Sequence, residues 1–338
     1  MADKNLIFNA LAYKDDYSSR PGLDEDFKSG IPGAGVQMYL KNSFVSLKSA
    51  KLHNPNDEVA LFTNFILPEA WKIQFQSNDI SIIYCDYNKF LMPKETPFSL
   101  AFYKLCALDF AVNHLDYIQY CILDCDTYVN GDFENIWEDS RDTLLCKNTL
   151  NPSNHPWRKE ISEIYYILYR TKKPITHLSG SVFAGSKDVL KRYLSNCYEC
   201  YSLFIDEYKK NDLYIPISGD ELIWSMGYEN CIYKMNSIEP YFLNVNHGWS
   251  RKGFYGASHM RYDGQNICIW HLISEKRYSM IWLYNYYTRH HAFPDIKTIA
   301  TACRIRNIHV SLTLLSLRTL LLDKNIISRN SKKRFKLV

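Results

Sequence analysis

Short apolar runs alternate with segments of helical periodicity over the first 137 residues, and this alternation constrains the fold more than any other feature of the sequence. Apolar runs predict four strands, at residues 6–12, 58–63, 80–84 and 117–123. Segments 36–52 and 98–112 repeat their apolar side chains at helical spacing and therefore predict helices. Strands that alternate with helices favour a mainly parallel central sheet with helices on its faces, so the predicted fold class is α/β.

The chain is long enough and apolar enough to bury a large core. It has 338 residues, of which 46% are hydrophobic and 22% charged, which is typical of a folded globular protein and excludes a disordered or fibrous one. The pattern continues with a helix at 161–169, a strand at 178–184 and a helix at 187–208. We expect one domain over residues 1–285 and a helical basic tail over residues 286–338.

Targeting signals and cysteine usage both predict a cytoplasmic protein. The first residues lack a basic segment followed by a long apolar stretch, and no uncharged apolar run reaches the roughly 18–20 residues of a membrane-spanning helix. Ten cysteines are scattered without a regular frame, as expected for reduced thiols. Cys197 and Cys200 form a Cys-x-x-Cys pair inside a helical pattern, so we interpret them as structural rather than as zinc ligands.

Positive charge is concentrated at the end of the sequence. Residues 300–338 contain nine Lys or Arg and one acid, Asp323, so this segment carries +8 while the chain as a whole carries +4. Apolar side chains recur at helical spacing over 299–322, ahead of a basic run at 332–336. Such a helix either lies peripherally on an anionic membrane surface or packs on the domain, and a nucleic-acid partner is not expected.

Asp124 and Asp126 directly follow the fourth predicted strand. Ligands of mainly parallel sheets bind beyond the carboxyl ends of the strands, which is where this pair would lie. Two carboxylates on one tight turn can hold a hard divalent cation, and such a cation neutralises the charge that grows on a diphosphate leaving group. Most Asp-x-Asp pairs are solvated loop acids, but the preceding strand favours a metal site here.

The sequence around this pair resembles that of a known enzyme family. Segment 120–137 (YCILDCDTYVNGDFENIW) resembles the signature of glycosyltransferase family 8, and segment 42–50 is similar to the first helix of that family. Segment 178–185 (LSGSVFAG) resembles the acceptor-side strand of family 6, in which an Asp-Glu pair follows, as Asp220 and Glu221 do here. The resemblance covers roughly residues 5–280. It implies a GT-A fold, with a nucleotide-binding half over 1–135 and an acceptor-side half over 136–285.

The resemblance also implies a metal site and a donor site. Asp124 would contact the ribose and the metal, Asp126 would bind the metal directly, and His271 would be the third ligand of Mn²⁺ or Mg²⁺. Lys276 would contact the diphosphate, and Arg251, Lys252 and Arg277 are weaker candidates for the phosphates. Four further residues would bind the rest of a UDP-sugar: Tyr13 and Asp16 (or its neighbour Asp15) the uracil, and Gly180 and Ser181 the sugar.

Asp220 and Glu221 are the candidate catalytic carboxylates. An inverting enzyme needs a carboxylate base beside the acceptor hydroxyl, whereas a retaining one needs a carboxylate or amide beneath the anomeric carbon. Both resembled families retain configuration, so we expect retention. Alternatively the two acids mark only a helix N-terminus, with Asp220 near the cap. His247 and Trp249 are candidates for contact with an acceptor sugar, although Trp249 is equally well explained by core packing.

The predicted function is metal-dependent transfer of a hexose from a UDP-sugar, such as UDP-galactose or a related hexose or N-acetylhexosamine, to a glycan or lipid-linked glycan. A role in bacterial cell-surface polysaccharide or lipopolysaccharide synthesis is expected. One alternative is a phosphatase of the haloacid-dehalogenase type, whose Asp-x-Asp-x-Thr motif lies on the first strand. Here Thr127 directly follows Asp126, and three predicted strands come earlier. Another alternative is a non-catalytic module that binds sugar nucleotides or glycans.

Overall fold

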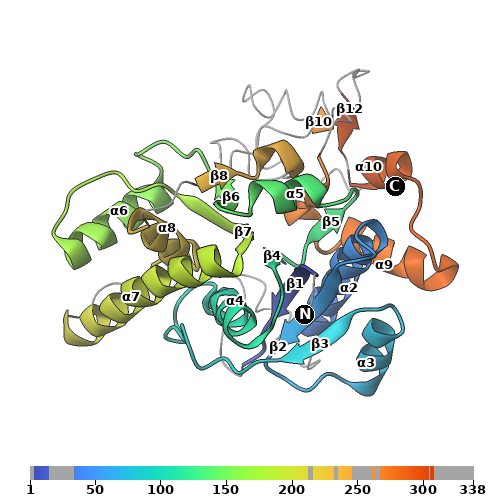
Figure 1. The fold of residues 1–338 in the computed structure, drawn as a ribbon, viewed down its shortest axis with the longest axis horizontal. Coiled ribbons are helices and arrows are strands. Elements are labelled where there is room, and N and C mark those ends of the chain that lie inside the picture. Colours follow the sequence, from blue (N-terminus) through green and yellow to red (C-terminus); the bar gives the residue numbers. More distant parts are fainter. Residues whose placement is uncertain are drawn as a thin grey trace, which may run out of the picture.

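A computed structural model describes residues 4–14, 34–211, 216–231, 235–245, 261–262, 267–303 and 305–307. Its centre is a seven-stranded sheet in the order β3-β2-β1-β4-β7-β6-β8 (Figure 1). The strands are β1 (Leu6–Leu11), β2 (Glu58–Thr63), β3 (Ser81–Tyr84), β4 (Gln119–Leu123), β6 (Leu144–Asn148), β7 (Leu178–Ser186) and β8 (Met235–Ser237). Only β7 runs antiparallel to its neighbours in this sheet, so the predicted α/β class with a mainly parallel sheet is confirmed.

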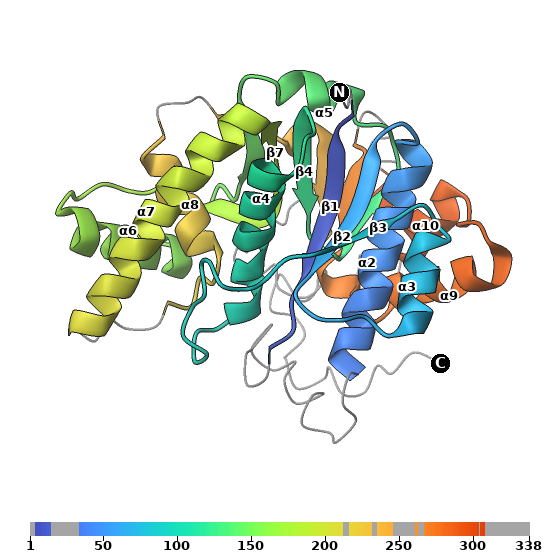
Figure 2. The ribbon, with the colours of Figure 1, turned by 60° about the horizontal axis from the view of Figure 1, so that its bottom comes forward.

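Helices cover both faces of this sheet, as Figure 2 shows. Alternate residues of β1 point to opposite faces: Phe8 packs in a core with helices α4 (Tyr103–His114) and α7 (Lys187–Asn211). Ile7 packs in a second core on the other face, with α2 (Ala34–His53) and α3 (Glu69–Gln76). This is the three-layer arrangement that buries a parallel sheet on both sides.

Four more helices complete the two layers. Helices α6 (Pro156–Tyr169) and α8 (Glu221–Glu229) contribute to the first core, while α5 (Glu134–Asp139) and α9 (Ser279–His290) contribute to the second. The 3-10 turns among the described residues are η1 (Ser99–Phe102), η2 (Glu239–Tyr241) and η5 (Ile273–Glu275). Helix α9 spans position 285 and packs against α2, and the domain boundary at that position stays a prediction.

A second, three-stranded sheet lies beyond the carboxyl end of β4. It has the order β5-β11-β9 and is formed by β5 (Thr127–Val129), β9 (Phe242–Asn244) and β11 (Ile269–His271). Strand β11 runs antiparallel to β5 and pairs His271 with Thr127. The pairing therefore brings the late histidine next to the turn that carries Asp124 and Asp126.

The predicted helix at 299–322 is confirmed only over 299–302 and is wrong at the described residues beyond Ala302. Helix α10 (Ile296–Ala302) begins at a cap in which Asp295 accepts the backbone N–H groups of Lys297 and Thr298, and it ends at Ala302. The next residues form β12 (Arg306–Asn307), which pairs with β10 (Arg261–Tyr262). Ile299 and Ile305 are both buried, so tertiary packing rather than one helical stripe explains their apolar character. The basic run at 332–336 lies outside the described residues.

The Cys-x-x-Cys pair and the lengths of the described helices bear on two further expectations. Cys197 and Cys200 lie on α7, and both are free thiols buried in the first core. Within the described ranges, no helix is both long enough and apolar enough to span a bilayer.

Candidate active site

Asp124 and Asp126 lie on a tight turn between β4 and β5 that is fixed from both sides. The N–H and hydroxyl groups of Thr127 both donate to the Asp124 carbonyl, at 3.2 and 2.9 Å. The Thr127 hydroxyl also lies 2.6 Å from that of Ser46 on α2, and the amide of Asn9 on β1 donates to the Leu123 carbonyl at 2.8 Å. The turn is therefore held by the neighbouring strand and helix.

Three side chains at this turn form a group that could hold a metal ion. His271 Nε2 lies 3.4 Å from Asp124 Oδ2 and 3.4 Å from Asp126 Oδ1, and one ligand atom of each residue lies within 4.8 Å of the others. Asp126 is fully buried, and its two carboxylate oxygens form ion pairs with His271 and Lys276 but accept no hydrogen bond of good geometry from the described residues. Buried oxygens without such partners, beside an imidazole, fit a divalent cation.

Positive charge next to Asp126 keeps it ionised. Burial opposes ionisation of Asp126, but the charges of Lys276, at 3.1 Å, and of His271 outweigh burial and hold the Asp126 pKa well below its usual range. Burial likewise works against the charge of Lys276, and Asp126 reverses this by raising the Lys276 pKa. The Asp126 site is thus built for a cation, and in this structure the Lys276 ammonium group lies beside it.

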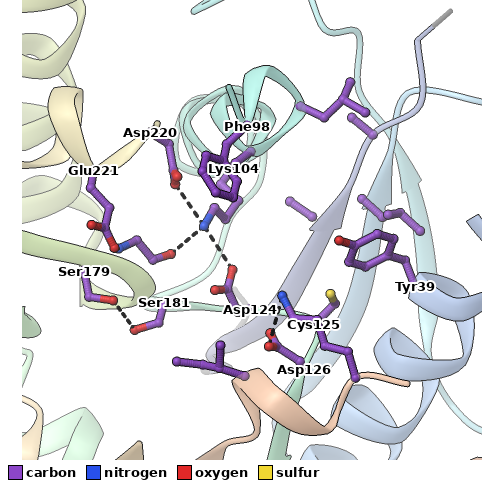
Figure 3. Close-up of a pocket in the computed structure, with 18 of the residues that line it drawn as sticks. Tyr39, Phe98, Lys104, Asp124, Cys125, Asp126, Ser179, Ser181, Asp220 and Glu221 are labelled. Atoms are coloured by element: carbon purple, nitrogen blue, oxygen red, sulfur yellow. Dashed lines mark hydrogen bonds and ion pairs between the residues drawn. The ribbon is translucent and has the colours of Figure 1, made fainter. Parts of the chain in front are cut away.

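Lys104 on α4 forms a second cluster on the other side of Asp124. Its ammonium group lies 3.0 Å from Asp124 Oδ1, 2.9 Å from Asp220 Oδ2 and 2.7 Å from the Gly180 carbonyl (Figure 3). Three acceptors match the three hydrogens of the group. Burial favours loss of the Lys104 proton, but the two carboxylates outweigh it and raise the Lys104 pKa. We did not predict Lys104 from the sequence; the available signal was a single lysine among apolar residues of that helix.

Asp220 and Glu221 stand at the start of α8, as the helix-terminus alternative predicts, but their side chains do not cap it. Asp220 occupies the N-cap position without accepting a capping hydrogen bond, and instead pairs with Lys104 and accepts from Trp224 Nε1 at 2.9 Å. Glu221 accepts from the Gly180 N–H at 3.3 Å and lies 2.7 Å from His177 Nε2. Burial raises the Glu221 pKa, and the hydrogen bond with His177 opposes that rise.

Gly180 lies at the closest approach between β7 and this second cluster. A Cβ atom at position 180 would come within 2.5 Å of Asp220 Oδ2 and 3.0 Å of Lys104 Nζ. The next residue, Ser181, accepts the Asp124 N–H through its carbonyl at 2.9 Å, and its hydroxyl lies 2.9 Å from that of Ser179. Residue 180 must therefore lack a side chain for Lys104 to reach both carboxylates.

A single pocket contains both clusters. Its lining includes nine of the predicted site residues: Tyr13, Asp124, Asp126, Gly180, Ser181, Asp220, Glu221, His271 and Lys276. It also includes Lys104, Tyr39, Phe98, Trp157 and Ser179, which sequence reasoning missed. Of the other candidates, Arg277 is exposed and does not line this pocket, and Asp15, Asp16, His247, Trp249, Arg251 and Lys252 lie outside the described residues. Figure 3 shows Asp124 between the Lys104 and Asp126 sides of this pocket.

Replacing Gly180 with alanine is expected to destabilise the protein by about 2–3 kcal/mol, because the new methyl group must displace the Asp220 carboxylate from Lys104. Urea denaturation of the variant and the wild type measures this difference. Gly185→Ala is a matched control on the same strand. Its methyl group would meet only apolar atoms, at 3.0 Å or more, so we expect a loss of under about 1 kcal/mol. Equal losses in the two variants would contradict the role assigned to Gly180.

Comparison with known proteins gives structural neighbours but no sequence relatives. No protein-family model matches the chain, and no curated protein matches it. Among solved structures, the chain is similar to the apo form of mouse xyloside xylosyltransferase 1, with 12% sequence identity, coverage of 80% of this chain and 97% of that chain, and a TM-score of 0.47. It is also similar to the galactosyltransferase LgtC in complex with donor and acceptor sugar analogues. That match has 13% identity, coverage of 79% of this chain and 86% of that chain, and a TM-score of 0.46.

Proposed function

We propose that this protein is a GT-A glycosyltransferase that transfers a hexose from a UDP-sugar to a glycan or lipid-linked glycan, with Mn²⁺ or Mg²⁺ and with retention of anomeric configuration. The observation that carries the proposal is the position of Asp124 between two clusters. One of its oxygens lies next to His271, in the group suited to a cation, and the other lies next to Lys104, in the group that contains Asp220. A diphospho-sugar donor needs a cation beside its leaving diphosphate and carboxylates beside its reacting carbon. The two groups must be adjacent, because the diphosphate is bonded to that carbon.

The first cluster, formed by Asp124, Asp126 and His271, would bind the diphosphate part of the donor. A divalent cation held by Asp124, Asp126 and His271 would neutralise the charge that develops on the diphosphate as the glycosidic bond breaks. Lys276 carries its positive charge beside the same carboxylates and would donate hydrogen bonds to phosphate oxygens. Tyr13, at the end of β1 in the same pocket, would contact the nucleobase.

The second cluster would bind the sugar. Lys104 holds the carboxylates of Asp124 and Asp220 on either side of its ammonium group, so both are available as acceptors for sugar hydroxyls. Gly180 leaves space beside them. Glu221 would stabilise positive charge that develops at the anomeric carbon, which is the role a retaining transferase requires of a carboxylate.

A panel of nucleotide sugars with Mn²⁺ tests the proposal by thermal shift and by slow release of free sugar from the donor. We expect one UDP-sugar to stabilise the protein by about 2.7 kcal/mol at a concentration a hundredfold above its Kd, and EDTA to remove both this shift and the hydrolysis. Turnover of p-nitrophenyl phosphate instead of a nucleotide sugar would favour the phosphatase alternative. Stabilisation without hydrolysis or transfer would favour a non-catalytic binding module. Transfer that persists in EDTA would contradict the proposed role of the metal.

A further inference from the structure

Glu221 contacts a buried histidine, His177, that we did not predict from the sequence. His177 directly precedes β7, and its Nε2 lies 2.7 Å from Glu221 Oε2, while the Gly180 N–H donates to Oε1 at 3.3 Å. The exposed fractions of the two side chains are 1% for His177 and 7% for Glu221. Both carboxylate oxygens of Glu221 thus have a protein donor, while the residue still lines the pocket.

Asn151 and Thr149 fix the position of His177. Asn151 Nδ2 lies 3.0 Å from His177 Nδ1, and the N–H and hydroxyl of Thr149 donate to the His177 carbonyl at 2.9 and 3.1 Å. An ionised carboxylate can only accept hydrogen bonds, so the Nε2–H of His177 is the donor to Glu221 whenever Glu221 is ionised. The Asn151 amide lies on the opposite ring nitrogen and holds the ring in the orientation that this contact needs.

We propose that His177 is a positioning residue for Glu221: its Nε2–H, with the ring held by Asn151, donates to the Glu221 carboxylate and keeps it oriented toward the pocket. This inference rests on the function proposed above, because it assumes that the Glu221 carboxylate acts on the donor sugar. Nothing in it depends on the metal site, since neither His177 nor Glu221 contacts Asp124, Asp126 or His271 through any hydrogen bond or ion pair among the described residues.

The charged groups around Glu221 determine how its pKa would change if His177 were lost. Asp220 precedes Glu221 and works against its ionisation, burial does the same, and the His177 ring and the Gly180 N–H oppose them. His155 lies farther back, with its ring centroid 6.1 Å from that of His177. Without the His177 donor the Glu221 pKa rises further, so the carboxylate is protonated at a higher pH. The pH at which activity declines on acidification must then move upward.

Two variants separate this role from simple packing. In His177→Gln the amide nitrogen can reach the position of Nε2 and still donate to Glu221, whereas in His177→Asn it reaches only the position of Nδ1. Both replacements are neutral amides, and both lose the ring. We expect His177→Asn to lower kcat of donor hydrolysis by up to about 100-fold with KM for the donor unchanged, and His177→Gln to recover most of that loss.

The pH dependence and a control complete the kinetic test. The acid limb of the kcat profile should lie at higher pH in His177→Asn than in the wild type, and should return toward the wild-type position in His177→Gln. His114→Asn, an exposed histidine on α4, should leave rate and profile unchanged. Equal losses in the Gln and Asn variants, or an acid limb that does not move, would overturn the proposal.

A spectroscopic readout distinguishes failure of this inference from failure of the proposed function. In protein labelled with ¹⁵N-histidine, the wild type should show a downfield ring N–H proton that exchanges slowly with solvent. The signal should disappear in His177→Asn and shift in Glu221→Gln. If it is present but no nucleotide sugar is ever turned over, the contact stands and the proposed function fails. If turnover is normal but the protected signal is absent, the His177 role fails alone.

Discussion

Replacing Asp126 with asparagine is expected to lower the metal-dependent turnover of donor by about a thousandfold. Asp126 is the fully buried member of the Asp124, Asp126 and His271 group, and its two oxygens face His271 and Lys276. An amide offers a weaker, neutral ligand and leaves the positive groups around it without their counter-ion. Loss of several kcal/mol of transition-state stabilisation by the cation corresponds to a factor of this size.

The same variant should also report on the apo protein. In EDTA, Asp126→Asn removes the ion pair between the fully buried position 126 and the partly buried Lys276 and should destabilise the fold by roughly 3 kcal/mol in urea denaturation. Asp142→Asn removes an exposed carboxylate from the segment before β6 and is the matched control, with no expected effect on either measurement. Wild-type metal dependence in Asp126→Asn would contradict the assignment of the cation site.

Replacing Lys104 with methionine is the second change with a large expected effect. The variant keeps an unbranched side chain, shorter by the ammonium group, and leaves Asp124 and Asp220 near each other without the group that both contact. Since breaking a buried ion pair by removing one partner typically costs about 3–5 kcal/mol, we expect a loss in that range by urea denaturation. Donor turnover should fall by at least about a hundredfold, because both carboxylates lose their fixed positions.

An exposed lysine provides the comparison for Lys104. Lys159 pairs with Glu163 one helical turn away at 3.5 Å, and the two side chains are 66% and 53% exposed. Lys159→Met should change the free energy of unfolding by no more than about 0.5 kcal/mol and leave turnover unaffected. If Lys104→Met were as stable and as active as this control, Lys104 would not be the organiser of the second cluster.

Much of the fold was predictable because local patterns decided it. The strand at 58–63 has the predicted bounds, since a Pro-containing turn precedes it and Asn64 follows it. The apolar strand that ends at Leu123 placed Asp124 at the sheet edge, where the structure has it. Periodicity also placed helices α2 and α7 to within a few residues. These features depend on short-range sequence, which one chain displays directly.

What the sequence did not reveal depends on contacts between distant segments. Lys104 reaches Gly180, 76 positions away, and His177 reaches Glu221, 44 positions away, so no local pattern marks either pair. The reversed direction of β7 and the end of α10 at Ala302 are likewise set by pairing partners elsewhere in the fold. The helix expected at 299–322 ends at Ala302 in the described residues, because Ile299 and Ile305 are buried by packing on either side of that helix end.

Crystals soaked with UDP and Mn²⁺ would show whether the metal lies at the Asp124 turn, through anomalous diffraction measured at the manganese absorption edge. We expect one strong peak at bonding distance from carboxylate oxygens of Asp124 and Asp126 and from a ring nitrogen of His271, with the diphosphate completing the coordination. We also expect no such peak in crystals of Asp126→Asn. A manganese ion bound elsewhere, or UDP bound in the pocket with no peak between these three residues, would contradict the assignment of the metal site.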